Sequence, residues 1–351
     1  MYYTQEQIDR ATQADLVSFL HGQGEQLTRA GNEYRAQPCD QPYDRRMPCP
    51  EAAQRLSGRT AGGRRRCGVS AQAAAGIRRP MNVRIGLAQH RIGPDMEENL
   101  RQAQRAVLAC AGQGAQLVLL PEMFCCLYQL ERLRACAQPR GGEIWKHLRA
   151  LACQAGVYLL GGSMPELDAQ GRIYNTSFFF SPAGEELACY RKCHLFDVSL
   201  PGGLCIQESS VFTPGEQLRV VESPFGKIGL AICFDLRFPE QFRALADRGA
   251  QLVLVPAAFN STTGPAHWEI NCRSRALDNQ VFLCACAPAA APDGPYPYYG
   301  HSMAVDPWGR ILTELSGEAC ERVVTLDLDE TARIRAQLPL LQSRRPELYR
   351  K

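Results

Sequence analysis

The chain has 351 residues, 45% of them hydrophobic and 21% charged, which is typical of a soluble globular protein of one large domain or two ordinary ones. No apolar run approaches the length needed to span a bilayer, and the N-terminus lacks the basic and apolar segments of a secretory signal. The net charge is +3, but residues 55–80 hold seven arginines and no lysine or acid, so the remainder is near neutral and lacks a nucleic-acid footprint. Sixteen cysteines without paired CxxC motifs predict a reduced, cytoplasmic protein with no zinc site.

The first 80 residues differ in character from the rest. Residues 5–20 have the apolar spacing of an amphipathic helix, whereas residues 36–80 are rich in proline, glycine, alanine and arginine and show no period, which predicts a linker or disorder. The segment 4–35 resembles the start of primase-type or Toprim-type proteins of mobile elements, but it ends before any zinc ligand or acidic centre. We therefore expect residues 1–80 to be a dispensable fused fragment or misread start, and residues 81–351, which begin with a methionine, to form the functional domain.

From residue 81 onward, strand and helix patterns alternate. The predicted strands are Val83–Gln89, Leu117–Leu120, Val157–Gly161, Tyr174–Phe180, Lys227–Ile232, Leu252–Val255, Val281–Ala285 and Val323–Leu328. The predicted helices are Asp95–Cys110, Glu143–Ala155, Pro239–Arg248 and Ala266–Leu277. Short and nearly all-apolar strands indicate an α/β fold whose sheets are covered by helices on at least one face.

One internal repeat is visible. Residues 114–121 read GAQLVLLP and residues 249–256 read GAQLVLVP, and each follows a predicted helix. Two related halves, each a sheet with helices on one side, would pack sheet to sheet as a four-layer α-β-β-α sandwich. The alternative is that helix–glycine–strand units often look alike without being related.

Cys233 follows an apolar strand ending at Ile232 and precedes a helix that Pro239 opens. A cysteine at such an elbow lies at the carboxyl end of the strand, where α/β proteins place their sites. The nearby helix N-terminus is expected to favour the thiolate, and the backbone N–H of Phe234 to hold a developing oxyanion. These features indicate a nucleophile, although a buried structural cysteine is the alternative.

Glu122 and Lys192 are two further candidates. Glu122 follows the strand Leu117–Leu120, at the sheet edge where Cys233 is expected, and partial burial would raise its pKa toward that of a general base. Lys192 lies between an aromatic-rich strand and a loop, where its ammonium could face a reacting carbonyl oxygen. In isolation, a turn cap and a solvated surface lysine are the alternatives.

Taken together, these segments resemble the nitrilase (carbon-nitrogen hydrolase) superfamily. LLPEMF carries Glu122, YRKCHLFD carries Lys192 and GLAICFDLRFPE carries Cys233, and the three match that family's Glu-Lys-Cys triad in order, spacing and flanking residues. The resemblance extends from residue 81 to about residue 350, and it implies the four-layer fold and catalysis without a metal or an organic cofactor. Three segments are most similar to the omega-amidase branch: 194–209, 256–280 and 299–309.

The same resemblance implies further site residues. Glu208 corresponds to a second acid that orients Lys192 or Glu122. Three positions correspond to residues that hold the far carboxylate of the substrate: Arg237, Phe259 and Thr263. A guanidinium suits bidentate carboxylate binding, and a hydroxyl can add one hydrogen bond.

Tyr128 corresponds to a tyrosine on the substrate side, but the residues before it depart from the family pattern. The family's Asn-Ser-Pro is replaced here by Cys125-Cys126-Leu127, which puts the shape of the pocket in doubt.

We therefore expect an amidase that hydrolyses the terminal amide of short dicarboxylate monoamides, such as 2-oxoglutaramate or 2-oxosuccinamate, through a thioester on Cys233. Amidases of the same superfamily that act on deaminated glutathione or on N-carbamoyl compounds are the nearest alternatives, and a catalytically silent scaffold is an alternative of another class. The expected partner is a small-molecule amide, with no nucleic acid and no membrane, and the expected assembly is a homodimer or higher homo-oligomer.

Overall fold

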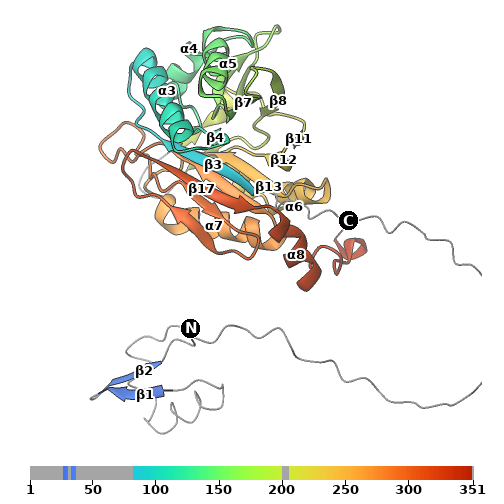
Figure 1. Cartoon of the computed structure of the whole chain (residues 1–351). Coiled ribbons are helices and arrows are strands. Elements are labelled where there is room, and N and C mark those ends of the chain that lie inside the picture. Colours follow the sequence, from blue (N-terminus) through green and yellow to red (C-terminus); the bar gives the residue numbers. More distant parts are fainter. Residues whose placement is uncertain (1–26, 31–32, 37–81, 200–204, 350–351) are drawn as a thin grey trace, which may run out of the picture. The chain divides into compact units, whose positions relative to one another are not determined.

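The computed structural model describes residues 27–30, 33–36, 82–199 and 205–349 (Figure 1). The chain separates into two units, residues 1–73 and 74–351. In the first unit, β1 (Leu27–Ala30) pairs antiparallel with β2 (Glu33–Ala36), a hairpin that the sequence analysis did not predict. The helix predicted over residues 5–20 lies outside the described residues, as does the linker beyond β2.

The second unit contains two large sheets. The seven-stranded sheet runs in the order β17-β3-β4-β5-β7-β6, with β8 paired to β7, and β3, β4 and β5 are parallel. Its strands are β3 (Asn82–Gln89), β4 (Leu117–Leu119), β5 (Tyr158–Leu160), β6 (Met164–Leu167), β7 (Ile173–Phe180), β8 (Glu186–Arg191) and β17 (Cys320–Asp327). The helices that accompany it in the chain are α3 (Met96–Gly112), α4 (Leu130–Ala135) and α5 (Glu143–Ala155).

The six-stranded sheet runs in the order β11-β12-β13-β14-β15-β16, and β12, β13 and β14 are parallel. Its strands are β11 (Arg219–Ser223), β12 (Gly226–Leu230), β13 (Leu252–Pro256), β14 (Phe282–Cys286), β15 (Met303–Val305) and β16 (Ile311–Glu314). The remaining elements are α6 (Pro239–Asp247), α7 (Gly264–Asn279), α8 (Asp329–Gln337), the short pair β9 (Asp197–Ser199) and β10 (Cys205–Gln207), and the 3-10 helices η1 (Glu208–Ser210), η2 (Cys233–Arg237) and η3 (Pro346–Leu348).

Side-chain alternation along the central strands explains why the sheets pack face to face. Leu117 and Leu119 of β4 join Leu252 and Leu254 of β13 in one buried cluster between the two sheets. The alternate residue Val118 points to the cluster that includes α3 and α5, and the alternate residues of β13 point to the one that includes α6 and α7. Figure 1 shows α3 and α5 on one side of the sheets and α7 on the other. The predicted α-β-β-α sandwich is therefore confirmed.

The two copies of the repeat occupy equivalent places. β4 and β13 are each flanked on both sides by parallel strands, one in each sheet. A strand in that position is buried on both faces, which requires the continuous apolar run that both copies have. The interpretation of the repeat as two related halves agrees with this arrangement.

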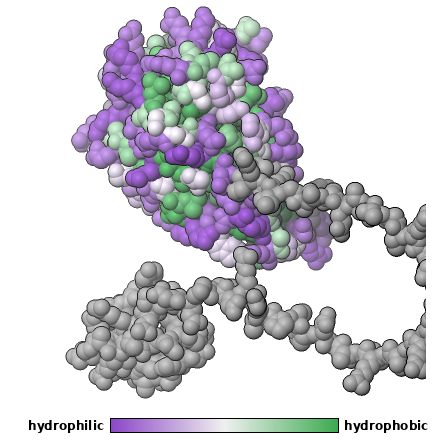
Figure 2. All heavy atoms as spheres, viewed as in Figure 1, coloured by the Kyte–Doolittle hydropathy of each residue, from purple (hydrophilic) through white to green (hydrophobic). Residues whose placement is uncertain are grey.

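On the face in Figure 2, hydrophilic side chains cover most of the domain and hydrophobic residues reach the surface in small groups. Among the residues that the structure describes, no helix is long and apolar enough to cross a membrane.

The helix α3 approaches β3 closely at Gly86, and we expect Gly86→Ala to destabilise the fold. A β-carbon at this position would lie 2.7 Å from Cβ and 2.8 Å from Sγ of Cys110 on α3, so strand and helix would have to separate. Overpacking of this kind costs about 1–3 kcal/mol, so the melting temperature should fall by roughly 3–10 °C.

The matched control is Gly112→Ala at the end of α3, where an added β-carbon meets nothing within 4 Å. Equal melting temperatures for the two variants would contradict this account of the packing.

Candidate active site

Cys233 lies just beyond β12, at the first residue of η2. Its φ of 42° lies in the left-handed region, which non-glycine residues rarely adopt and which recurs at functional sites. The Sγ atom accepts a hydrogen bond from the N–H of Ala258 at 3.4 Å. Phe234 is the second residue of η2, a position whose N–H has no partner within a helix.

The predicted helix that Pro239 opens is confirmed as α6, and the five-residue η2 lies between the strand end and that helix. The thiol is more protonated than the sequence suggested, because burial raises its pKa well above the usual value and the charge of Glu122 raises it further. A resting thiolate is therefore not favoured, and the thiol needs a base beside it.

Glu122 and Lys192 form a buried ion pair with Glu208. Nζ of Lys192 lies 2.9 Å from Oε1 of Glu122 and 3.0 Å from both carboxylate oxygens of Glu208. All three side chains are fully buried. Glu122 follows β4 and Lys192 follows β8, so the ends of two strands of the seven-stranded sheet bring them together. The solvated-lysine and turn-cap alternatives do not match this arrangement.

The charges in this cluster perturb one another. Burial raises the pKa of Glu122, Lys192 opposes that rise, and Glu208 adds to it. Burial alone would lower the pKa of Lys192, but the two carboxylates outweigh it and raise the value above that of a free lysine. No donor among the described residues is placed to form a well-aligned hydrogen bond with Oε2 of Glu122. The Cys233 thiol lies near this carboxyl group and lowers its pKa. A carboxyl with a raised pKa beside a protonated thiol suits general acid–base catalysis.

Glu208 accepts more donors than the sequence analysis foresaw. Besides Lys192, it accepts the hydroxyl of Tyr128 at 2.7 Å, the N–H of Phe196 at 2.5 Å and Nδ2 of Asn175 at 3.3 Å. Within the described part of the chain, no hydrogen bond joins Glu208 directly to Glu122. Glu208 therefore fixes the position of the Lys192 ammonium, and the hydroxyl proton of Tyr128 is already donated to Glu208.

Asn175 and Asp235 were missed from the sequence. Asn175 on β7 donates from Nδ2 to Glu122 at 2.8 Å as well as to Glu208. The buried carboxylate of Asp235 accepts the backbone N–H groups of His194 and Ile232 and the hydroxyl of Tyr190. It thus ties the segment that carries Lys192 to the turn that carries Cys233.

A small cavity of about 10 Å³ opens beside Cys233, and the residues that the resemblance implied for substrate binding all line it. Arg237 lies over the rings of Phe234 and Phe259 at 5.7 and 5.2 Å, and its Nη1 lies 3.2 Å from Nδ1 of His267. It pairs with no carboxylate among the described residues, so neither Asp235 nor Glu240 nearby in the sequence neutralises its charge. The full lining is Tyr128, Phe196, Cys233, Phe234, Arg237, Ala258, Phe259, Asn260, Thr263 and Tyr296.

Thr263 lines the cavity but its hydroxyl already donates to Oδ1 of Asn260 at 3.2 Å. The hydroxyl oxygen of Thr263 can therefore accept a hydrogen bond from a ligand. To donate one to a substrate carboxylate, the hydroxyl must break its bond to Asn260. Phe259 packs its ring against Trp268 at a centroid distance of 4.9 Å, which holds that wall of the cavity in place.

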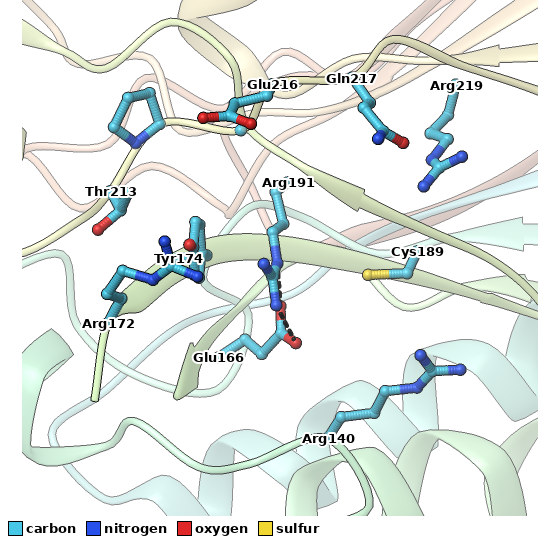
Figure 3. Close-up of a pocket in the computed structure, with 12 residues that line it drawn as sticks. Arg140, Glu166, Arg172, Tyr174, Cys189, Arg191, Thr213, Glu216, Gln217 and Arg219 are labelled. Carbon is cyan, nitrogen blue, oxygen red and sulfur yellow. Dashed lines mark hydrogen bonds and ion pairs between the residues drawn. The ribbon is translucent and has the colours of Figure 1, made fainter. Parts of the chain in front are cut away.

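A larger pocket, of about 360 Å³, lies elsewhere, along β6, β7 and β8 (Figure 3). Tyr174 lines it, and alternation along β7 directs that side chain to the opposite face of the sheet from Asn175. Three of its four arginines are already paired with acids: Arg140 with Glu186, Arg172 with Asp168 and Arg191 with Glu166. Because Cys233 lines the smaller cavity, the smaller cavity is the candidate site. Among the described residues, no cluster of three or more His, Cys, Asp or Glu side chains is arranged to hold a metal ion.

Comparisons with known proteins agree with this geometry. Residues 84–336 match the carbon-nitrogen hydrolase family. The omega-amidase NIT2 of Mus musculus is 42% identical over 266 residues, which cover 76% of this chain and 96% of that protein; the human omega-amidase NIT2 is 41% identical over 268 residues, covering 76% and 97%. Among solved structures, Saccharomyces cerevisiae Nit3, a member of branch 10 of the nitrilase superfamily, is 34% identical with a TM-score of 0.69, covering 75% of this chain and 97% of that one.

An amidase from Nesterenkonia is 33% identical with a TM-score of 0.65, covering 76% of this chain and 95% of that one. One structure of a Glu-to-Gln variant of that amidase records the Michael addition of acrylamide at the active-site cysteine. The family match, these identities and the buried Glu-Lys-Cys cluster lead to one conclusion: this chain belongs to the carbon-nitrogen hydrolase family.

Proposed function

We propose that this chain is an omega-amidase that hydrolyses the terminal amide of short dicarboxylate monoamides, such as 2-oxoglutaramate and 2-oxosuccinamate, and releases ammonia. The observation that carries the proposal is Arg237, a cation that lines the same cavity as Cys233 and has no acidic partner among the described residues. Burial lowers the pKa of its guanidinium, so an anionic ligand would restore a stabilising charge beside it. The names of the relatives support the same activity.

The geometry supports a two-stage reaction. Glu122 takes the thiol proton as Cys233 attacks the amide carbon, and the charge of Lys192 and the N–H of Phe234 stabilise the oxyanion. Glu122 then protonates the departing nitrogen, which leaves as ammonia and gives a thioester on Cys233. In the second stage Glu122 activates water, which releases the carboxylic acid and returns the proton to the thiol.

We expect Arg237→Ala to remove the preference for a carboxylate at the far end of the substrate. Truncating a charged contact in a desolvated pocket costs roughly 2–5 kcal/mol, so kcat/KM for 2-oxoglutaramate should fall about 30- to 5,000-fold. The measurement is ammonia release from 2-oxoglutaramate and from a neutral amide of the same length.

The neutral amide is the control, because it has no carboxylate to lose and should react at nearly the wild-type rate. An equal loss with both substrates would mean that Arg237 is structural. A panel that adds nitriles and N-carbamoyl acids tests the alternatives, and faster wild-type turnover of one of those classes would replace the omega-amidase proposal.

The same proposal includes a small-molecule substrate, a cytoplasmic location and a homo-oligomer. The thirteen cysteines among the described residues are all unpaired, which supports a reducing compartment. Ile270 and Leu277 on α7 and Trp308 in the turn before β16 are 63%, 41% and 48% exposed, which supports an apolar contact between copies. Sedimentation equilibrium tests this part: Ile270→Asp should lower the mass of the assembly, and a monomeric wild type would exclude it.

A further inference from the structure

Asn260 presents a buried hydrogen-bond donor to the cavity. Its side chain is fully buried and lines the cavity with Cys233 and Arg237. Oδ1 accepts the backbone N–H groups of Thr262 and Thr263 at 3.0 and 2.9 Å, in addition to the hydroxyl of Thr263. Backbone N–H groups can only donate, so this end of the amide must be the oxygen and the other end must be the NH2 group.

The NH2 group is left without adequate acceptors. No acceptor among the described residues is placed to form a well-aligned hydrogen bond with Nδ2. Tyr296 is a polar neighbour that interacts with Asn260, but its hydroxyl already donates to the carbonyl of Ala258 at 2.7 Å. Its oxygen can accept at most one of the two N–H groups of Nδ2. A buried donor without an acceptor is costly, and a ligand that brings an acceptor oxygen removes the cost.

The backbone around Asn260 fixes the direction of this donor. The carbonyl of Asn260 accepts the N–H of Gly264 at 2.7 Å, and Asn260 forms an isolated antiparallel bridge with Tyr298. With Oδ1 held by the start of α7, the amide cannot rotate without losing three hydrogen bonds. The donor is therefore preorganised before a ligand arrives.

We propose that Nδ2 of Asn260 donates a hydrogen bond to an oxygen at the far end of the substrate, and thereby selects amides whose far end carries a carboxylate or 2-oxo oxygen. This inference rests on the proposed function and adds a second, uncharged determinant to Arg237. A site that hydrogen-bonds its substrate rejects analogues without the oxygen, because the buried donor is then left unpaired.

The test is Asn260→Asp, which keeps the size and the Oδ1 acceptor for α7 but replaces the donor with an acceptor oxygen. Hydrogen bonds to charged groups contribute about 1.5–3 kcal/mol, so kcat/KM for 2-oxoglutaramate should fall roughly 10- to 150-fold, mainly through KM. A neutral amide with an alkyl far end should change less than about threefold. Asn260→Ser serves as a second variant, because a hydroxyl can still accept from the start of α7 but cannot supply the amide donor.

Glutaramate, which lacks the 2-oxo oxygen, separates the two sources of the acceptor. An equal loss with glutaramate assigns the bond to the carboxylate, and an undiminished rate with glutaramate assigns it to the 2-oxo oxygen. Either result supports the inference. The same loss with the alkyl-ended amide, or no loss with any substrate in both variants, overturns it.

Calorimetric binding of the product 2-oxoglutarate gives a readout that does not depend on turnover. We expect both variants to bind it at least tenfold more weakly than the wild type. If both variants bind 2-oxoglutarate as tightly as the wild type does, this inference is overturned and the proposed function still stands. A wild type that neither binds 2-oxoglutarate nor turns over 2-oxoglutaramate would overturn both.

Discussion

Lys192→Met is expected to abolish measurable amide hydrolysis. The lysine is fully buried between Glu122 and Glu208, so its removal takes the positive charge away from the reacting carbonyl and leaves two carboxyl groups without a cation. Loss of one oxyanion-stabilising group typically lowers kcat about 10²–10³-fold, and loss of one partner of a buried ion pair costs about 3–5 kcal/mol of stability. Both kcat and the melting temperature should therefore fall.

The pH dependence provides a sharper readout than the loss of rate alone. Lys192 opposes the rise in the pKa of Glu122, so its removal should raise that pKa further. Because Glu122 must be deprotonated to accept the thiol proton, the acidic limb of the residual pH–rate profile should move to higher pH.

Lys227→Met is the matched control, since Lys227 is a half-exposed lysine that pairs with the exposed Glu222. An exposed pair contributes little, so kcat and the melting temperature should stay near the wild-type values. A Lys192 variant that resembles the Lys227 variant would contradict the assigned role.

Glu122→Gln is expected to lower kcat about 10²–10⁴-fold with little change in melting temperature. The amide oxygen of glutamine can still accept from Asn175 and Lys192, so the buried network stays largely in place. The NH2 group that replaces Oε2 cannot take a proton from the Cys233 thiol. Steady-state kinetics and thermal unfolding on the same preparation separate these two effects.

Glu166→Gln provides the control for removing a carboxylate. Glu166 is also buried, but it pairs with Arg191 and accepts the hydroxyl of Thr176 at the larger pocket. We expect this variant to lower the melting temperature and to retain kcat. The account fails if Glu166→Gln inactivates the enzyme and Glu122→Gln does not.

Sequence patterns predicted the central strands because these are buried on both faces. β4 and β13 read as uninterrupted apolar runs, and their repeated sequence indicated two related halves. Edge strands such as β8 and β16 were missed because one of their faces is partly exposed and the sequence mixes polar and apolar residues. The hairpin β1–β2 was missed for a related reason, since its four-residue strands lack a periodic apolar pattern.

The candidate site was predictable only where short motifs carried it. Glu122, Lys192 and Cys233 lie in distinctive segments, whereas Asn175 lies in an ordinary aromatic strand that gives no signal of its own. Asn260 falls in a segment that the sequence analysis noted, but which of its side-chain atoms is free depends on how α7 begins. The raised pKa of Cys233 was also unpredictable, because it follows from burial and from a carboxyl group brought close only by folding.

The central claim is that Cys233 forms a thioester with the substrate. The direct measurement is mass spectrometry of wild-type protein mixed with 2-oxoglutaramate and quenched in acid during turnover, followed by peptide mapping. The account predicts one acyl group on the peptide that contains Cys233, and neither acylation nor ammonia release in folded Cys233→Ala. Acylation of Cys125 or Cys126 instead, or ammonia release by Cys233→Ala, would contradict it.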